Sequence, residues 1–196
     1  VMFKYCAAGI LLLATCQANA ALVAGDIAFA SFNADEDGFS LVPFVNLDAN
    51  TTIFFTDNEW NGAALGAGGA FNSGESYLQW NTGASAINAG TVVRFSDEDK
   101  TTLAASLGAF SRVSVSGSTN YGLANSTETL YAYLGVSATA PSVFLTAITN
   151  GNFASDGSIA NTGLIQGANA MDLNGSQSTS PDFAEYNGIR SGLTRI

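Results

Sequence analysis

The sequence contains no histidine, and its only cysteines, Cys6 and Cys16, lie close to the N-terminus. Ser-His-Asp and Cys-His nucleophile systems are therefore excluded from the rest of the chain, and so are the usual zinc sites, which rely on histidine and cysteine. The GxxxxGK[ST] motif that cradles nucleotide phosphates is also absent. These absences favour a protein that is not an enzyme.

Positive charge is scarce as well. The 196 residues include 6 lysines and arginines against 16 acids, and charged residues make up only 11% of the chain, less than half of the usual roughly 25%. Nucleic-acid binding requires clustered basic side chains, so the composition argues against it. It argues equally against docking on anionic lipid. A surface rich in uncharged polar residues fits a component of the cell surface or matrix, or a polysaccharide, as the partner.

The N-terminal segment has the features of a secretory signal. Lys4 supplies a positive start, "AAGILLLA" (residues 7–14) is an apolar stretch too short to span a bilayer, and "ANA" (residues 18–20) offers the small residues of a cleavage site. We expect cleavage after Ala20. Lipoprotein processing at Cys16 and a buried N-terminal core segment are the alternatives.

A cleaved signal predicts a secreted or cell-surface protein with one domain over residues 21–196 and no membrane insertion after processing. Both cysteines would leave with the signal, so no disulfide could stabilise the exported domain. Its fold would then depend on core packing and, as a further possibility, on a bound metal ion. The sequence stops at Ile196 soon after "RSG" without a sorting tail, so we expect a truncated C-terminus.

Hydrophobic periodicity is mostly two, which is typical of strands. Gly, Asn and Ser clusters, which favour turns, separate the apolar runs. One segment, Asp97–Gly108, begins with acids and places Leu103 and Leu107 four apart, which predicts a short helix. Two long loops are expected, at Gly62–Gly74 and Asn174–Phe183. The pattern predicts a β-sandwich with strands within Gly25–Phe32, Phe39–Leu47, Asn50–Asp57, Ser76–Trp80, Gly90–Ser96, Ser111–Ser116, Glu128–Gly135 and Ser142–Thr149.

The stretch "GDIAFASFNADEDGFSLVPFVNLDANTTIFFTDNEWNG" (residues 25–62) resembles the opening of a group of secreted bacterial β-proteins, and "TIFFTDNEW" (residues 52–60) is its most specific part. "LQWNTGASAINAGTVVRFS" (residues 78–96) and the "YNG.RSG" pattern at residues 186–192 extend the resemblance over most of the exported chain. Many members end in sorting tails of the PEP-CTERM or type 9 kind. The resemblance implies an Ig-like or lamin-tail-like sandwich at the cell surface and carries over no activity.

Calcium is the cofactor that the acids suggest. "NADEDG" places Asn33, Asp35 and Asp37 at alternate positions before a glycine, which is the first half of an EF-hand loop. Phe44 occupies the position of the closing glutamate, so a β-loop site would need ligands from elsewhere. Asp57 and Glu59 in "TDNE" could supply them if the two loops share an end of the sandwich. The alternative is a polar hairpin turn that binds nothing.

Two further hypotheses stay open. A carbohydrate-binding module would need exposed aromatic rings, and Trp60, Tyr77 and Trp80 are the candidates. A glycoside hydrolase would need one protonated and one ionised carboxyl group facing a cleft. Its candidates are Glu59, Glu75, Glu128 and Glu185, and no spacing among them selects a pair. The leading hypothesis is therefore a structural or adhesive β-sandwich. Stabilisation of its fold by calcium is a further hypothesis.

Overall fold

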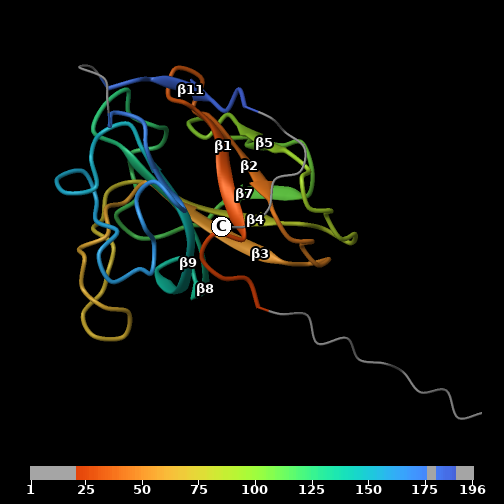
Figure 1. Ribbon diagram of the computed structural model, residues 1–196, viewed down its shortest axis with the longest axis horizontal. Helices are drawn as coiled ribbons and strands as arrows, with labels where there is room; N and C mark the ends of the chain where they lie inside the picture. The colour runs from red at the N-terminus through yellow and green to blue at the C-terminus, as the bar shows by residue number, and fades with distance from the viewer. Residues whose placement is uncertain (1–20, 176–179, 189–196) are drawn as a thin grey trace, which may run out of the picture.

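The computed structural model describes residues 21–175 and 180–188, which form two stacked β-sheets (Figure 1). The predicted signal, residues 1–20, lies outside the described residues. The strands are β1 (Ile27–Asn33), β2 (Gly38–Pro43), β3 (Thr52–Thr56), β4 (Tyr77–Asn81), β5 (Val93–Ser96), β6 (Ala104–Ala105), β7 (Ala109–Arg112), β8 (Thr129–Ser137), β9 (Ala140–Thr149), β10 (Ala170–Asp172) and β11 (Phe183–Glu185).

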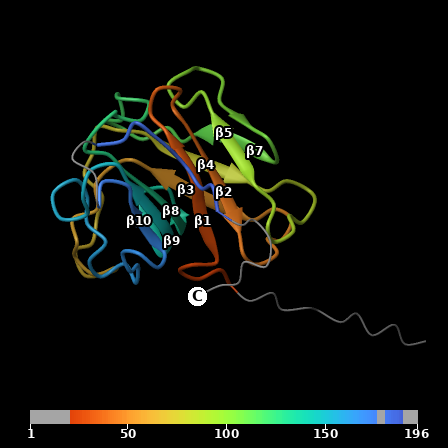
Figure 2. The same cartoon turned by 45° about the horizontal axis from the view of Figure 1, so that its top comes forward.

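The first sheet has the order β11-β1-β2-β5-β6 and the second the order β10-β9-β8-β3-β4-β7. All pairs are antiparallel except β10 with β9. In Figure 2, β1 and β2 cross in front of β3 and β4, as expected for two sheets packed face to face. The predicted all-β sandwich is confirmed.

Alternating side chains from both sheets fill the space between them. Phe39 on β2 stacks on Phe95 of β5 with ring centroids 4.8 Å apart, and Phe39 also contacts Phe55 on β3 of the other sheet at 5.0 Å. Trp80 is fully buried in the same core, where its indole nitrogen donates a hydrogen bond to the Leu107 carbonyl. These contacts join the two sheets through aromatic packing.

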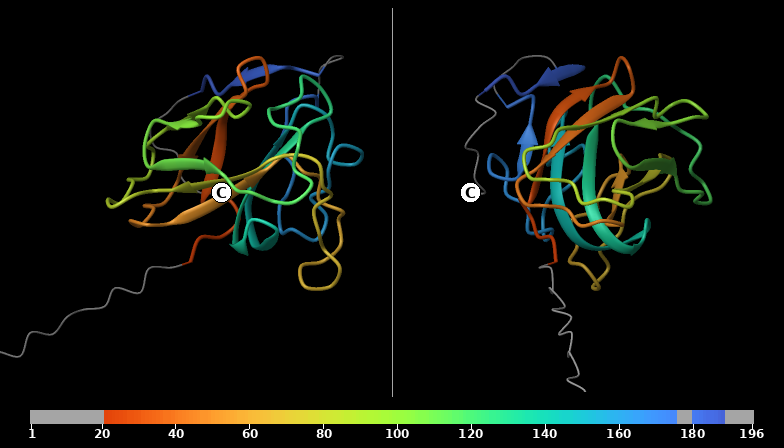
Figure 3. Two further views of the ribbon diagram at one scale, coloured as in Figure 1. Left: turned by 180° about the vertical axis from the view of Figure 1, so that it is seen from behind. Right: turned by 90° about the vertical axis from the view of Figure 1, so that its right-hand side faces the viewer.

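The second sheet is also covered on its outer face. A second buried cluster, which includes Phe54, Trp60, Tyr131, Tyr133 and Phe144, lies there. The long loops beside β8 and β9 pack over it, on the side away from β1 (Figures 1 and 3). Burial on both faces explains why "TIFFT" and "TLYAY" read as continuous apolar runs rather than as alternating ones.

The glycine-rich Gly62–Gly74 segment is a loop, as predicted, but it is packed rather than free. Its Phe71 ring contacts Trp60 at a centroid distance of 5.2 Å. A Cβ at Gly69 would lie 2.4 Å from the Trp60 ring, so only glycine lets the backbone cross the indole this closely. The loop therefore closes the second core.

The predicted helix over Asp97–Gly108 is wrong. Between Asp97 and Gly108 the chain forms turns, bends and the short strand β6 (Ala104–Ala105), and no helical turn. The segment instead turns back so that β6 pairs with the end of β5, with Ala105 opposite Phe95. Strand pairing at a sheet edge has overridden a weak helical spacing of two leucines. Within the part of the chain that the structure describes, no helix has the length and apolar character needed to cross a membrane.

Candidate metal centre

Four strand ends from both sheets converge at one end of the sandwich. β3 ends at Thr56, which pairs with Tyr77 at the start of β4 and with Tyr131 near the start of β8. In the first sheet, β5 ends at Ser96. Antiparallel pairing therefore brings the residues that follow β3 and precede β4 and β8 to the same edge.

Each of these strand ends carries an acid. Asp57 follows β3, Glu75 precedes β4, Glu128 precedes β8, and Glu98 follows β5. Oxygen atoms of Asp57, Glu75 and Glu128 all lie within 4.8 Å of one another. Glu98 joins them through Ser76, whose hydroxyl lies 3.1 Å from Asp57 Oδ1 and 2.5 Å from Glu98 Oε1. We call these four residues the acidic cluster.

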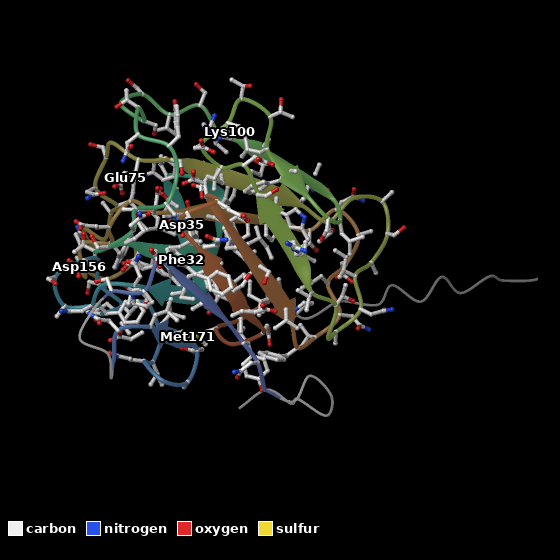
Figure 4. All side chains as sticks on the ribbon, turned by 90° about the horizontal axis from the view of Figure 1, so that it is seen from above. Phe32, Asp35, Glu75, Lys100, Asp156 and Met171 are labelled. Atoms are coloured by element: carbon white, nitrogen blue, oxygen red, sulfur yellow. The ribbon has the colours of Figure 1, made fainter. Side chains whose placement is uncertain are left out.

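Most of the acidic cluster is closed to solvent. Asp57 and Glu98 are 0% exposed and Glu128 is 4% exposed, whereas Glu75 is half-buried. Glu75 therefore forms the side of the cluster that solvent can reach, and Figure 4 shows it on a loop at the periphery of the molecule. Carboxylates are rarely buried this completely without a partner of opposite charge.

Buried amides hold two of the glutamates in position. Asn58 Oδ1 accepts a hydrogen bond from the Glu75 backbone nitrogen at 3.2 Å, and Asn150 Oδ1 accepts one from the Glu128 backbone nitrogen at 2.8 Å. Both asparagines are fully buried. The glutamates are thus placed by the folded backbone and not by chance contact at the surface.

The environment disfavours the ionised form of every member. Burial, reinforced by the charge of Glu98, raises the pKa of Asp57 well above its ordinary value. Burial raises the pKa of Glu98 to about 7 and that of Glu128 to about 8, and it also raises the pKa of Glu75. Desolvation of like charges in one site has this effect on carboxyl groups.

Two carboxylate oxygens of the acidic cluster lack a hydrogen-bond partner. Asp57 Oδ2 and Glu98 Oε2 are inaccessible to solvent and meet no donor among the residues that the structure describes. Ser76 carries one hydroxyl hydrogen for the two carboxyl groups that it touches, so it cannot donate to both. The cluster therefore has more acceptor oxygens than the protein supplies donors.

No basic side chain forms an ion pair with the acidic cluster in the described ranges. Arg112 comes closest, but it donates to the backbone carbonyls of Glu98 and Lys100, and its guanidinium lies 3.9 Å above the Tyr121 ring. The ion pair found, between Lys100 and Asp99, is on the surface. The charge of Arg112 acts to lower the pKa of Glu98, but burial outweighs it. One guanidinium cannot balance four acids, so protons or a bound cation would have to supply the rest.

The donor set fits a hard cation. All its side-chain donors are oxygens, contributed by separate segments of the chain, and calcium accepts 6 to 8 such oxygens in flexible geometry. Magnesium demands a more regular octahedron, and zinc favours histidine and cysteine. Asp57, Glu75 and Glu128 would be the direct ligands, with Glu98 beside them.

Of the five residues expected to bind calcium, the structure brings only Asp57 into the acidic cluster. Asn33 and Asp35 belong to the β1–β2 turn, where Asn33 Oδ1 accepts a hydrogen bond from the Glu36 backbone nitrogen and Asp35 is exposed (Figure 4). This is the polar hairpin turn that the sequence allowed as an alternative. Glu59 binds Asn72 instead, through a bond of 3.1 Å from the amide nitrogen.

Asp37 lies at the same end of the sandwich without joining the group. Its carboxylate accepts a hydrogen bond of 2.8 Å from the Leu123 backbone nitrogen, and its carbonyl accepts one of 3.1 Å from Glu98. Burial raises its pKa, and the neighbouring Asp99 adds to the effect. The β1–β2 turn and the residue after β3 therefore do share an end of the sandwich, linked through Glu98.

Sequence reasoning placed Glu75 and Glu128 among possible hydrolase acids but not among metal ligands. They are separated from Asp57 by 18 and 71 positions in the sequence, so no local motif joins them. The strand pattern does offer a signal, because each acid lies within two residues of an apolar run that forms an interior strand of the second sheet. Only the strand order shows that these ends meet.

The carbohydrate-binding alternative requires exposed rings at Trp60, Tyr77 or Trp80. These residues are 2%, 4% and 0% exposed, so none presents a ring to a ligand. All three belong to the two cores, which is the other role that the sequence allows for the tryptophans.

Searches of protein-family models, curated proteins and solved structures with this chain found no match.

Proposed function

We propose that this protein is an exported, non-enzymatic β-sandwich with a structural or adhesive role at the cell surface or in the extracellular matrix, and that calcium stabilises its fold. The observation that carries the calcium part of the proposal is the acidic cluster of Asp57, Glu75, Glu98 and Glu128. Three of its members are buried, and none forms an ion pair with a basic side chain in the described residues. A bound cation would neutralise these negative charges, so that the acidic cluster would stabilise the folded state instead of destabilising it.

The position of the cluster supports a stabilising role. Asp57, Glu75 and Glu128 extend from the second sheet, and Glu98 extends from the first. A cation bound by Asp57, Glu75 and Glu128 would also be linked to Glu98 through the Ser76 hydroxyl. It would therefore connect the two sheets at one end of the sandwich. Because no disulfide can stabilise the exported part of the chain, a cation that connects the sheets would add substantially to its free energy of unfolding.

Burial favours a structural role over glycoside hydrolysis. The Asp57, Glu75 and Glu128 oxygens are close enough for a carboxylate pair, since hydrolases that retain configuration place theirs about 5 Å apart. A sugar must, however, reach both carboxyl groups, and Asp57 and Glu128 are closed to solvent. Glycoside hydrolysis that disappears in both Glu75→Gln and Glu128→Gln variants would overturn the non-enzymatic part of the proposal.

Thermal unfolding tests the calcium part. The protein is stripped with EGTA and melted in EGTA, in 2 mM calcium and in 2 mM magnesium, the last as a control for non-specific charge screening. An ion at 100 times its Kd adds about 2.7 kcal/mol to the free energy of unfolding, which corresponds to a Tm increase of about 5–10 °C for a domain of this size. An equal Tm in calcium and in EGTA would refute calcium stabilisation.

A further inference from the structure

The outer face of the first sheet carries a hollow that the acidic cluster does not involve. It has a volume of about 740 Å³ and lies across β11, β1, β2, β5 and β6, within the roughly 300–1,000 Å³ range of small-ligand sites. We call it the sheet-face groove. Alternation along the strands sends Phe32, Phe39 and Phe95 into the core, so their neighbours face this groove.

Small polar side chains form the floor of the groove. One cross-strand row runs from Glu185 through Ser31 and Ser40 to Arg94. The Ser31 and Ser40 hydroxyls bond to each other at 2.6 Å in the middle of this row. Short side chains in the centre and longer ones at both ends make the sheet face concave.

Arg94 provides an uncommitted donor at one wall. Its backbone nitrogen donates to Ser106 Oγ, but its exposed guanidinium has no hydrogen bond or ion pair with any residue in the described ranges. A guanidinium offers five N–H donors in a fixed planar arrangement, which suits neighbouring oxygen atoms on one ligand.

Phe183 provides an apolar wall on the opposite side. It sits on β11 opposite Asn33, and 54% of its surface is exposed. An exposed aromatic ring beside hydroxyl and charged groups is the combination that binds the apolar face of a sugar ring while hydrogen bonds hold its hydroxyls. This is the exposed aromatic that Trp60 and Trp80 do not supply.

The charges in the groove select the class of ligand. Glu36 lines the groove together with Arg94. An anionic ligand would meet the Glu36 carboxylate, and a cationic ligand would meet the guanidinium. A neutral polyhydroxylated ligand can donate a hydrogen bond to the carboxylate and accept hydrogen bonds from Arg94 at once. We propose that the sheet-face groove binds a neutral saccharide chain, with Phe183 against a sugar ring and Arg94 on its hydroxyl groups.

Affinity electrophoresis tests this proposal. The protein, kept in calcium, is run through native gels cast with a linear glucan, a galactomannan or a xylan, and through a gel cast with hyaluronate, which calcium does not gel, as an acidic comparison. Retardation by at least one neutral polysaccharide is expected. Retardation by none of them, or by hyaluronate alone, would overturn the proposal.

Two variants locate the binding. Arg94→Gln and Phe183→Ala are each expected to weaken retardation about tenfold, which is the loss expected for one charged hydrogen-bonding group or one stacking ring. Lys100→Gln and Ile165→Ala remove an exposed charge and an exposed apolar side chain outside the groove and should bind as the wild type does. Because all four positions lie on the surface, circular dichroism should be unchanged. Equal retardation of the wild type, Arg94→Gln and Phe183→Ala would place binding elsewhere and refute the assignment.

Discussion

Two acidic regions lie at the same end of the sandwich and differ in almost every other respect. The β1–β2 turn contains Asp35, Glu36 and Asp37 in succession, and its acids are exposed or half-buried. The acidic cluster draws single acids from four distant segments and buries three of them completely or nearly so. The turn is conspicuous in the sequence and is held by hydrogen bonds within it and from the Leu123 backbone nitrogen. The cluster is inconspicuous, and two of its carboxylate oxygens have no hydrogen-bond partner among the described residues.

The comparison teaches that a run of acids in the sequence is not by itself the place where unpaired carboxylates gather. Consecutive acids on a tight turn point into water, where solvation makes a cation unnecessary. Acids held under packed strands lose that solvation, so they require protons or a cation. Four predictions test this contrast.

Among the substitutions, the largest effect is expected for Asp57→Asn. This change keeps the size of a buried side chain while it removes a carboxylate from the proposed centre. The calcium-dependent gain in free energy of unfolding, about 2.7 kcal/mol at 100 times the Kd, should be lost. In EGTA the variant should be at least as stable as the wild type, because like charges no longer crowd together. A calcium response equal to that of the wild type, measured by thermal melts, would remove Asp57 from the centre.

The next effect is a pH dependence in EGTA. Glu98 and Glu128 have folded pKa values of about 7 and about 8 against an ordinary value of 4.5. Between pH 4.5 and 8 the folded state therefore binds more protons than the unfolded state, and stability falls as the pH rises. Each group contributes at most about 1.4 kcal/mol per pH unit. Urea melts from pH 5 to 8 should show this decline in EGTA and a weaker one in calcium, and a rise of stability with pH in EGTA would contradict the account.

Asp37 should respond to substitution as a structural residue. Its φ of 48° lies in the left-handed region, and its carboxylate accepts the Leu123 backbone hydrogen bond. Asp37→Ala should cost about 2 kcal/mol, from backbone strain and the lost bond together. Asp37→Gly relieves the strain and should cost less. Chemical denaturation in calcium measures both, and a larger loss for Asp37→Gly would show that backbone strain is not important here.

The smallest effect is expected for Asp35→Asn, the matched control for Asp57→Asn. Asp35 is exposed on the turn, so the stability should change by less than about 0.5 kcal/mol. Its Tm increase with calcium should equal that of the wild type. Loss of the calcium-dependent Tm increase in this variant would show that the metal site lies in the β1–β2 turn.

Much of the fold could be predicted from the sequence, because strand signals are local. The runs that became β1, β2, β3, β8 and β9 were evident from apolar and β-branched residues. The segment after Asp97 was misread because β6 owes its conformation to pairing with β5, which no local pattern reveals. β10 and β11 are three-residue strands that depend in the same way on β9 and β1.

The acidic cluster was less predictable than the fold. Asp57 was among the expected ligands because it stands in a visible acidic motif, "TDNE". Glu75 and Glu128 stand alone in the sequence, and their proximity follows from the placement of β3 between β4 and β8. A ligand set assembled by strand order becomes visible only when the order of the strands is known.

Isothermal titration of calcium into the EGTA-stripped and desalted protein tests the central claim most directly. The account predicts one saturable site in the wild type and in Asp35→Asn, and its loss in Asp57→Asn and Glu128→Gln. The absence of saturable binding to the folded wild-type protein, or binding that Asp57→Asn and Glu128→Gln leave unchanged, would contradict it.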